Sequence, residues 1–161
     1  MAKRTFVISL LMGMVVSFCL AGDDVQRIPR VSYVDGDASL QESGDTGWST
    51  IDVNLPLQSG DRLVLEREGL LEVEVDDGSF IRLNQFSELT VNRLRDDEII
   101  LGLPRGELIM RVRSEVNYII QTPMGDVVLN LGGLYRINVR HDGSVELLVI
   151  VLPPVDSARR H

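Results

Sequence analysis

Few side chains in this sequence have the chemistry that catalysis or metal binding usually needs. The chain contains two histidines, His141 and His161, and a single cysteine, Cys19. Neither histidine has a cysteine or a second histidine near it, so the usual spacing of a zinc site is absent. No nucleophile elbow, phosphate-binding loop or dinucleotide-binding fingerprint occurs. The sequence therefore predicts no catalytic residue, no metal site and no cofactor, and we interpret His141 as a solvated turn residue.

Carboxylates are the one abundant group with reactive potential. A short stretch of the chain carries Glu66, Glu68, Glu72, Glu74, Asp76 and Asp77. Acids on adjacent strands could bind calcium, or divide into the acid and the base of a hydrolase. The alternation of acids with apolar residues between Leu71 and Val75 instead favours a solvated sheet face. We expect these acids to pair across strands with arginines, namely Arg62, Arg67 or Arg82.

Trp48 is the only tryptophan and the one weak candidate for a ligand-binding residue. It follows the polar segment 44–47, and a tryptophan in a loop can form a binding platform or fold back over the core. Both interpretations remain open. The three tyrosines, Tyr33, Tyr118 and Tyr135, each occupy an apolar position of a predicted strand, so we expect them in the core.

The elements that must position these residues are strands. Apolar alternation recurs at intervals of about 8 to 12 residues with turn residues between, which is typical of an all-β domain. Two hairpins are expected, Leu70–Val75 with Phe80–Leu83 around Asp77-Gly78, and Tyr135–Val139 with Val145–Val149 around 141–144. The other predicted strands are Val31–Val34, Ala38–Gln41, Arg62–Leu65, Leu89–Leu94, Glu98–Leu101, Glu107–Val112, Tyr118–Gln121 and Val127–Asn130. We predict one domain of short, mostly antiparallel strands and hairpins, arranged as a β-sandwich or an irregular β-solenoid.

The two ends of the chain differ in character from the middle. Lys3 and Arg4 precede an apolar run that ends in small residues at Ala21, which is the pattern of a signal peptide over residues 1–21. An uncleaved membrane anchor and a lipoprotein processed at Cys19 are the alternatives. Residues 153–161 begin with two prolines, so we expect a disordered tail there. The β domain is then expected to occupy residues 22–152.

Charge narrows the range of partners. The formal net charge is −8, and cleavage after Ala21 removes two cations and brings it to −10. Phosphate-rich partners require a positive field, so nucleic acid and anionic membrane surfaces are disfavoured, and membrane contact is expected only if the N-terminal segment stays uncleaved. The same cleavage removes the only lysine and the only cysteine. We expect an exported chain, periplasmic or extracellular, whose fold relies on burial and hydrogen bonds without disulfides.

A series of short motifs resembles a known family. They are Arg30–Asp37 with the later Trp48, Asn54–Leu57 leading into Gly60–Leu63, Asp77–Ser79 with Ile81–Leu83, Gly106–Leu108 with Arg111-Val112, Thr122-Pro123, and Gly133–Val139 before Asp142-Gly143. In this order and spacing the chain resembles the bacterial FecR-type domain, including its stand-alone exported versions, over roughly Arg30 to Val149. The resemblance implies a β-rich periplasmic module that binds another protein or an envelope ligand without enzymatic activity.

The chain departs from that family at both ends. In membrane-spanning relatives the domain passes a signal from an outer-membrane receptor to a cytoplasmic segment that controls a sigma factor. Here only a few residues precede the apolar run, so we expect no cytoplasmic segment. Where relatives add a further strand, this chain reads Leu152-Pro153-Pro154, which would leave a sheet edge open for a partner strand. We therefore expect a non-enzymatic module that binds a protein or envelope ligand in signal sensing, with a structural or carbohydrate-binding domain of the cell wall as the alternative.

Overall fold

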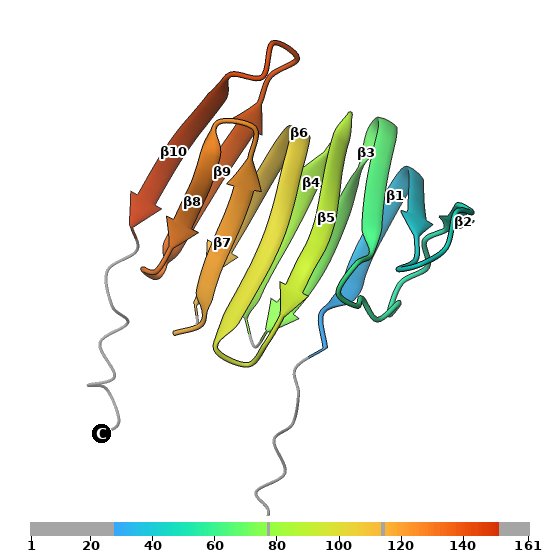
Figure 1. Ribbon diagram of the computed structural model, residues 1–161, viewed down its shortest axis with the longest axis horizontal. Helices are drawn as coiled ribbons and strands as arrows, with labels where there is room; N and C mark the ends of the chain where they lie inside the picture. The colour runs from blue at the N-terminus through green and yellow to red at the C-terminus, as the bar shows by residue number, and fades with distance from the viewer. Residues whose placement is uncertain (1–27, 77, 114, 152–161) are drawn as a thin grey trace, which may run out of the picture.

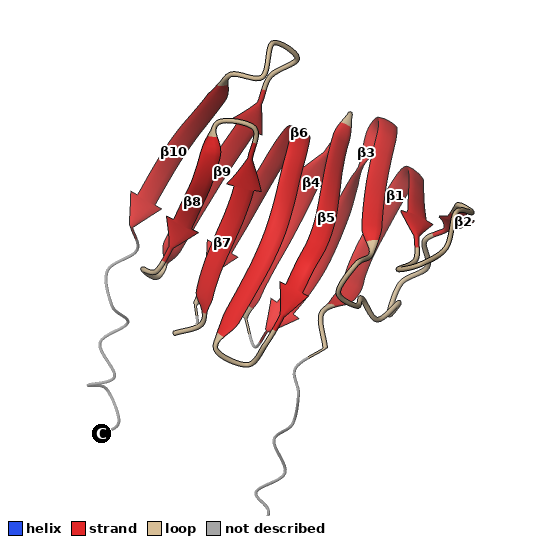
Figure 2. Ribbon diagram, viewed as in Figure 1, coloured by secondary structure: helices blue, strands red, loops and turns tan. Residues whose placement is uncertain are grey.

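The structure is a computed structural model that describes residues 28–76, 78–113 and 115–151. The expected signal segment 1–21, the tail 153–161 and Asp77 of the first expected turn lie outside the described residues. The strands are β1 (Arg30–Gln41), β2 (Ser49–Thr50), β3 (Arg62–Asp76), β4 (Ser79–Asn84), β5 (Ser87–Leu94), β6 (Glu98–Val112), β7 (Asn117–Thr122), β8 (Gly125–Leu129), β9 (Gly133–Val139) and β10 (Val145–Val151). Strands joined by loops make up the described chain (Figure 2), and no helix that could span a membrane occurs within it.

A closed ring of strands forms the centre of the fold. The N-terminal halves of β3 and β6 both pair with β5, and their C-terminal halves both pair with β4. The ring order is therefore β3–β4–β6–β5, which makes a small barrel. β1 runs antiparallel along β3, and β2 adds to the end of β1. From β6, the pair β9–β10 continues one layer and the pair β7–β8 continues the other (Figure 1).

The expected all-β architecture is confirmed, and so are both hairpins. In the first, Val73 lies opposite Ile81, and in the second Ile137 lies opposite Leu147. The pairings are antiparallel except for β6 with β7, which is parallel. The arrangement is a two-layered sheet wrapped around one core and not a stack of solenoid turns, because the ring closes on itself.

Three of the strands are longer than the sequence pattern predicts. The separate strands expected within residues 31–41, 62–75 and 98–112 are joined into β1, β3 and β6. Glycines allow these long strands to bend from one layer to the other. Gly36 (φ 88°) lies opposite Gly69, and a Cβ on Gly36 would lie 2.4 Å from the carbonyl oxygen of Glu68. Here a glycine that reads as a turn signal marks a bend inside a strand.

The core lies inside the ring and between the two layers. Its largest fully buried side chains are Tyr118, Leu40, Leu57, Leu63, Leu65, Leu71, Ile81, Leu83, Leu89, Leu101, Leu103 and Leu108. Tyr118 and Tyr135 are buried as expected, but Tyr33 is 48% exposed, so its predicted core position is wrong. The cause is a β-bulge between Val31 and Tyr33, which turns Tyr33 to the outer face opposite Glu72.

Candidate ligand-binding groove

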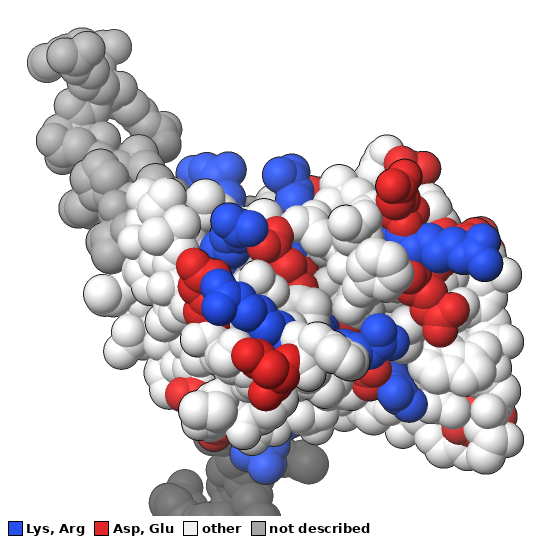
Figure 3. Space-filling model, turned by 90° about the horizontal axis from the view of Figure 1, so that it is seen from above, with Lys and Arg blue, Asp and Glu red and all other residues white. Residues whose placement is uncertain are grey.

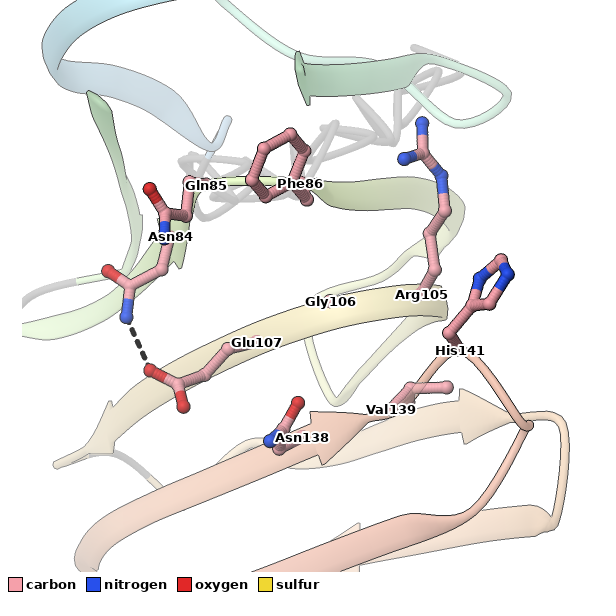
Figure 4. Close-up of a pocket in the computed structure, with 9 residues that line it drawn as sticks. All are labelled: Asn84, Gln85, Phe86, Arg105, Gly106, Glu107, Asn138, Val139 and His141. Carbon is pink, nitrogen blue, oxygen red and sulfur yellow. Dashed lines mark hydrogen bonds between the residues drawn. The ribbon is translucent and has the colours of Figure 1, made fainter. Parts of the chain in front are cut away.

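A groove of about 520 Å³ crosses the outer surface where three segments meet. The segments are the turn between β4 and β5, the bend of β6, and the end of β9 with the loop that follows. The lining residues are Asn84, Gln85, Phe86, Arg105, Gly106, Glu107, Asn138, Val139 and His141. Figure 4 shows the ring of Phe86 and the side chain of Arg105 on one side of the groove, and Asn138, Val139 and His141 on the other.

Phe86 is the most unusual residue of the groove. It lies in the two-residue turn between Asn84 and Ser87, its φ is 58°, and its side chain is 57% exposed. A left-handed backbone costs a residue with a Cβ about 1–2 kcal/mol, a cost that glycine avoids and asparagine reduces. An exposed ring recovers little of that energy by burial. Strain of this kind combined with exposure of an aromatic ring is typical of a ligand-binding position.

The turn that carries Phe86 is held tightly against β6. The Ser87 hydroxyl is buried, accepts a hydrogen bond from the Glu107 N–H at 2.9 Å and lies 3.2 Å from the Glu107 carbonyl oxygen, to which it donates. Gly106 makes this approach possible, because a Cβ there would lie 2.3 Å from the Ser87 Oγ and 2.7 Å from the Phe86 carbonyl oxygen. The barrel strands β4, β5 and β6 therefore fix the position of the Phe86 side chain.

The polar groups of the groove fall into two sets. Both carboxylate oxygens of Glu107 accept hydrogen bonds, one from Asn84 Nδ2 and the other from Arg136 Nε at 2.7 Å. By contrast, the side chains of Gln85, Asn138 and His141 make no hydrogen bond to any residue that the structure describes. These three side chains offer hydrogen-bond donors and acceptors to a ligand, while Glu107 is held in place as part of the groove surface.

A cluster of charged side chains connects the groove with the N-terminal part of the domain. The buried carboxylate of Glu88 lies 3.3 Å from Arg105 Nε and 2.6 Å from Arg62 Nε. Burial raises the pKa of Glu88, but the hydrogen bonds and charges of Arg62 and Arg105 outweigh burial and hold that pKa below its ordinary value. The guanidinium of Arg62 also stacks on Trp48, 5.4 Å from the ring centroid. Trp48, the residue that the sequence singled out, is half-exposed and does not line the groove.

The comparison with protein families matches the FecR protein family to residues 61–151, which is more than half of the chain. The chain belongs to the FecR protein family. This family is involved in signal sensing. No curated protein and no solved structure matches the chain. The matched part of this FecR domain contains every residue of the groove, whereas Trp48 lies outside it.

The acidic stretch of the FecR domain lies apart from the groove. Glu72 pairs with Arg82 at 2.6 Å, as expected. Asp76, which follows the alternating stretch, is buried and accepts hydrogen bonds from the Tyr118 hydroxyl and the Ser79 N–H. Among the described residues, no group of three or more histidines, cysteines or acids is placed to hold a metal ion.

Sequence reasoning assigned no function to any residue of the groove. It interpreted His141 as a solvated turn residue, and His141 lies exposed in the loop between β9 and β10. It missed Phe86, Gln85 and Asn138. A signal for Phe86 was present: an aromatic residue stands in a short polar segment between two predicted strands, where glycine or asparagine is usual. No sequence signal could join it to Asn138, because that contact depends on how β9 packs beside β6.

Proposed function

We propose that this FecR domain is a non-enzymatic, exported module that senses a signal in the cell envelope by binding a ligand in the Phe86 groove. The observation that carries the proposal is the exposed ring of Phe86, held at positive φ beside polar side chains that have no hydrogen-bond partner among the described residues. Family membership supports the sensing role, and the signal-peptide pattern of residues 1–21 supports export.

The polar groups suit an extended segment of a partner protein. The amides of Gln85 and Asn138 can each donate and accept, which matches the N–H and C=O groups of a peptide backbone. An apolar side chain of the same peptide can pack on Phe86. Arg105 and Arg62 share the single carboxylate of Glu88, which leaves a net positive charge at one side of the groove, so an acidic residue in the peptide would be favoured.

The absence of enzymatic activity is supported by the state of the one carboxylate in the groove. Each oxygen of Glu107 accepts a hydrogen bond, one from Asn84 and the other from Arg136, which holds this carboxylate in place as a structural group.

An envelope polysaccharide is the second candidate ligand. An exposed aromatic ring flanked by planar amides and an imidazole can stack on a sugar ring and bind its hydroxyl groups. The same residues would bind either ligand, so one set of variants tests both candidates.

The test compares Phe86→Ala and Asn138→Ala with the wild-type domain. The matched control is Tyr33→Ala, which removes an equally exposed aromatic ring outside the groove. Binding is measured by crosslinking in envelope extracts and by NMR titration with peptidoglycan fragments. We expect both groove variants to lose at least about tenfold in affinity, which corresponds to about 1.4 kcal/mol, and the control to bind normally.

Two results would contradict the proposal. Unchanged binding by Phe86→Ala and Asn138→Ala would remove the groove from the function. Loss of binding in Trp48→Ala alone, with both groove variants intact, would move the ligand site to the loop that holds Trp48.

A further inference from the structure

The two edge strands of the sheet, β1 and β10, differ in whether other parts of the chain cover them. At the β1 edge the chain covers itself: the Val31 N–H donates to the Leu55 carbonyl oxygen, and the Asn54 N–H donates to the Val31 carbonyl oxygen. Ile51 and Leu57 of the same covering segment are buried. At the opposite edge, β10 pairs with β9 and with no other strand among the described residues. Figure 1 shows β10 as the outermost strand on that side.

The backbone of β10 presents hydrogen-bonding groups to this open edge. The Arg140 N–H donates to the Ser144 carbonyl oxygen at the hairpin loop. Hydrogen-bonded pairs alternate along an antiparallel ladder, so Glu146, Leu148 and Ile150 bond to β9. It follows that the N–H and C=O groups of Leu147 and Val149 point away from β9.

The side chains of β10 are apolar on both faces. Leu147 and Val149 lie opposite the buried Ile137 and Tyr135 and therefore face the core side, and Leu148 and Ile150 face outwards. All four are nevertheless 42–53% exposed. Natural edge strands usually carry a charge or a proline that prevents pairing, and β10 carries neither between Leu147 and Ile150.

From this geometry we propose that β10 is the dimer interface of the protein, where it pairs antiparallel with β10 of a second copy. A two-fold axis normal to the sheet leaves the inner face of each copy on the same side of the joined sheet, so residues placed opposite each other across the axis must point to the same face. This condition is met when Leu148 of one copy lies opposite Leu148 of the other, with the axis between them. This register places Leu147 opposite Val149 of the second copy, and the outward backbone groups of these two residues then meet as hydrogen-bonded pairs.

The β10 edge meets the charge requirement of a contact between two copies. Each chain carries a net charge of −8, which opposes self-association, so an interface between two copies needs an uncharged surface. In Figure 3 the charged side chains gather mainly away from the β10 side, and the surface visible at that side is largely uncharged. Glu146, the one charge on β10, is 2.8 Å from Arg140 and would lie opposite Ile150 of the second copy. No like charges oppose each other in this register.

The chain's own C-terminal residues are a poorer fit. After Leu152 the sequence has two prolines, which cannot donate to a ladder, and then mainly polar or charged residues. A strand that covers Leu147 and Val149 must be apolar. A second β10 meets that requirement, and no residue of β10 lines the Phe86 groove, so dimerisation stands apart from ligand binding.

The test uses the charge at the two-fold axis. In Leu148→Lys two lysines would oppose each other, and in Leu148→Glu two glutamates would, so we expect the dimer dissociation constant of each variant to rise about tenfold or more. Mixing the two variants, one of them labelled uniformly with ¹⁵N, should restore a dimer, which native mass spectrometry distinguishes by mass as a heterodimer. The control is Val128→Lys, an equally exposed apolar residue on β8, which should leave the dimer intact.

A disulfide tests the register independently. Residues opposite each other at a non-hydrogen-bonded position have Cα atoms about 4.5 Å apart, within the range that a disulfide spans. With Cys19→Ser, so that no other thiol is present, Leu148→Cys should crosslink under mild oxidation and Val128→Cys should not. A wild-type protein that stays monomeric up to about 1 mM would overturn the proposal. So would Leu148→Lys with unchanged dimerisation, or a mixture that forms no heterodimer.

Discussion

Arg62 donates its Nε–H to the Glu88 carboxylate at 2.6 Å, and this contact joins β3 to β5 on the small barrel. Arg105 of β6 reaches the other oxygen of the same carboxylate, so three strands of the ring meet at one buried acid. The pKa of Glu88 is lowered in the folded state although burial opposes this. The contribution of Glu88 to stability is therefore present above the ordinary glutamate pKa of about 4.3 and lost as the pH falls through the lower folded value.

Glu88→Gln tests that contribution. At neutral pH we expect the variant to lose about 1–3 kcal/mol in free energy of unfolding, because two guanidinium groups lose their charged partner. The difference from wild type should shrink as the pH falls below about 4. Urea unfolding at a series of pH values measures both effects. Glu146→Gln is the control, since its pair with Arg140 is exposed and should contribute less than about 1 kcal/mol. A constant difference across the acid range would contradict the assignment.

Gly36→Ala tests the bend of β1 against β3. Gly36 and Gly44 have similar φ angles of 88° and 80°, but a Cβ meets the Glu68 carbonyl oxygen at 2.4 Å in the first case and nothing within 4 Å in the second. We expect Gly44→Ala to lose about 1–2 kcal/mol from backbone strain alone and Gly36→Ala to lose about 1–3 kcal/mol more from the clash. Chemical unfolding of both variants gives the comparison. Equal losses would show that the close approach is unimportant.

Tyr118→Phe tests the link between β7 and β3 through the core. The Tyr118 ring is fully buried and its hydroxyl donates to Asp76. Removing that hydroxyl takes a donor from a buried carboxylate, so we expect a loss of about 1–3 kcal/mol in unfolding free energy. In Tyr135→Phe the lost bond is to the Leu131 carbonyl oxygen, near the surface, and a smaller loss is expected. Thermal unfolding that ranks the two variants in the reverse order would refute this account.

Phe86→Asn separates stability from ligand binding. Asparagine tolerates the left-handed backbone better than phenylalanine, so we expect a gain of about 0.5–1 kcal/mol in unfolding free energy together with loss of ligand binding. Leu131→Asn is a control for removing an exposed apolar side chain, because Leu131 is not at positive φ, and no gain is expected there. A Phe86→Asn domain less stable than wild type would mean that the ring contributes to folding.

The local parts of the fold were predictable from sequence. The two hairpins depend on neighbouring strands and turn residues, and their registers follow from alternation alone. The barrel closes because β3 and β6 each pair with β4 in one layer and with β5 in the other, and no local sequence pattern encodes this long-range pairing. For the same reason, glycines that read as turn signals at Gly36 and Gly106 lie inside long strands.

The candidate site was largely hidden from sequence reasoning. Trp48 drew attention as the single tryptophan, yet it stacks on Arg62 outside the groove. Phe86 stands out because of its positive φ, which the sequence does not show. Asn138 reaches the groove only because β9 lies beside β6. Tyr33 was misplaced because a bulge of one residue reverses the face that a side chain occupies.

The ring β3–β4–β6–β5 is built from one unbroken stretch of chain, residues 62–112. Its strands contact partners that are close in sequence, which favours rapid folding, so the barrel can close before β1 docks on one side and β9 and β10 dock on the other. The flanking strands are then additions to a finished nucleus. A change in the length or sequence of a flanking strand should then alter the periphery of this domain without reopening the barrel.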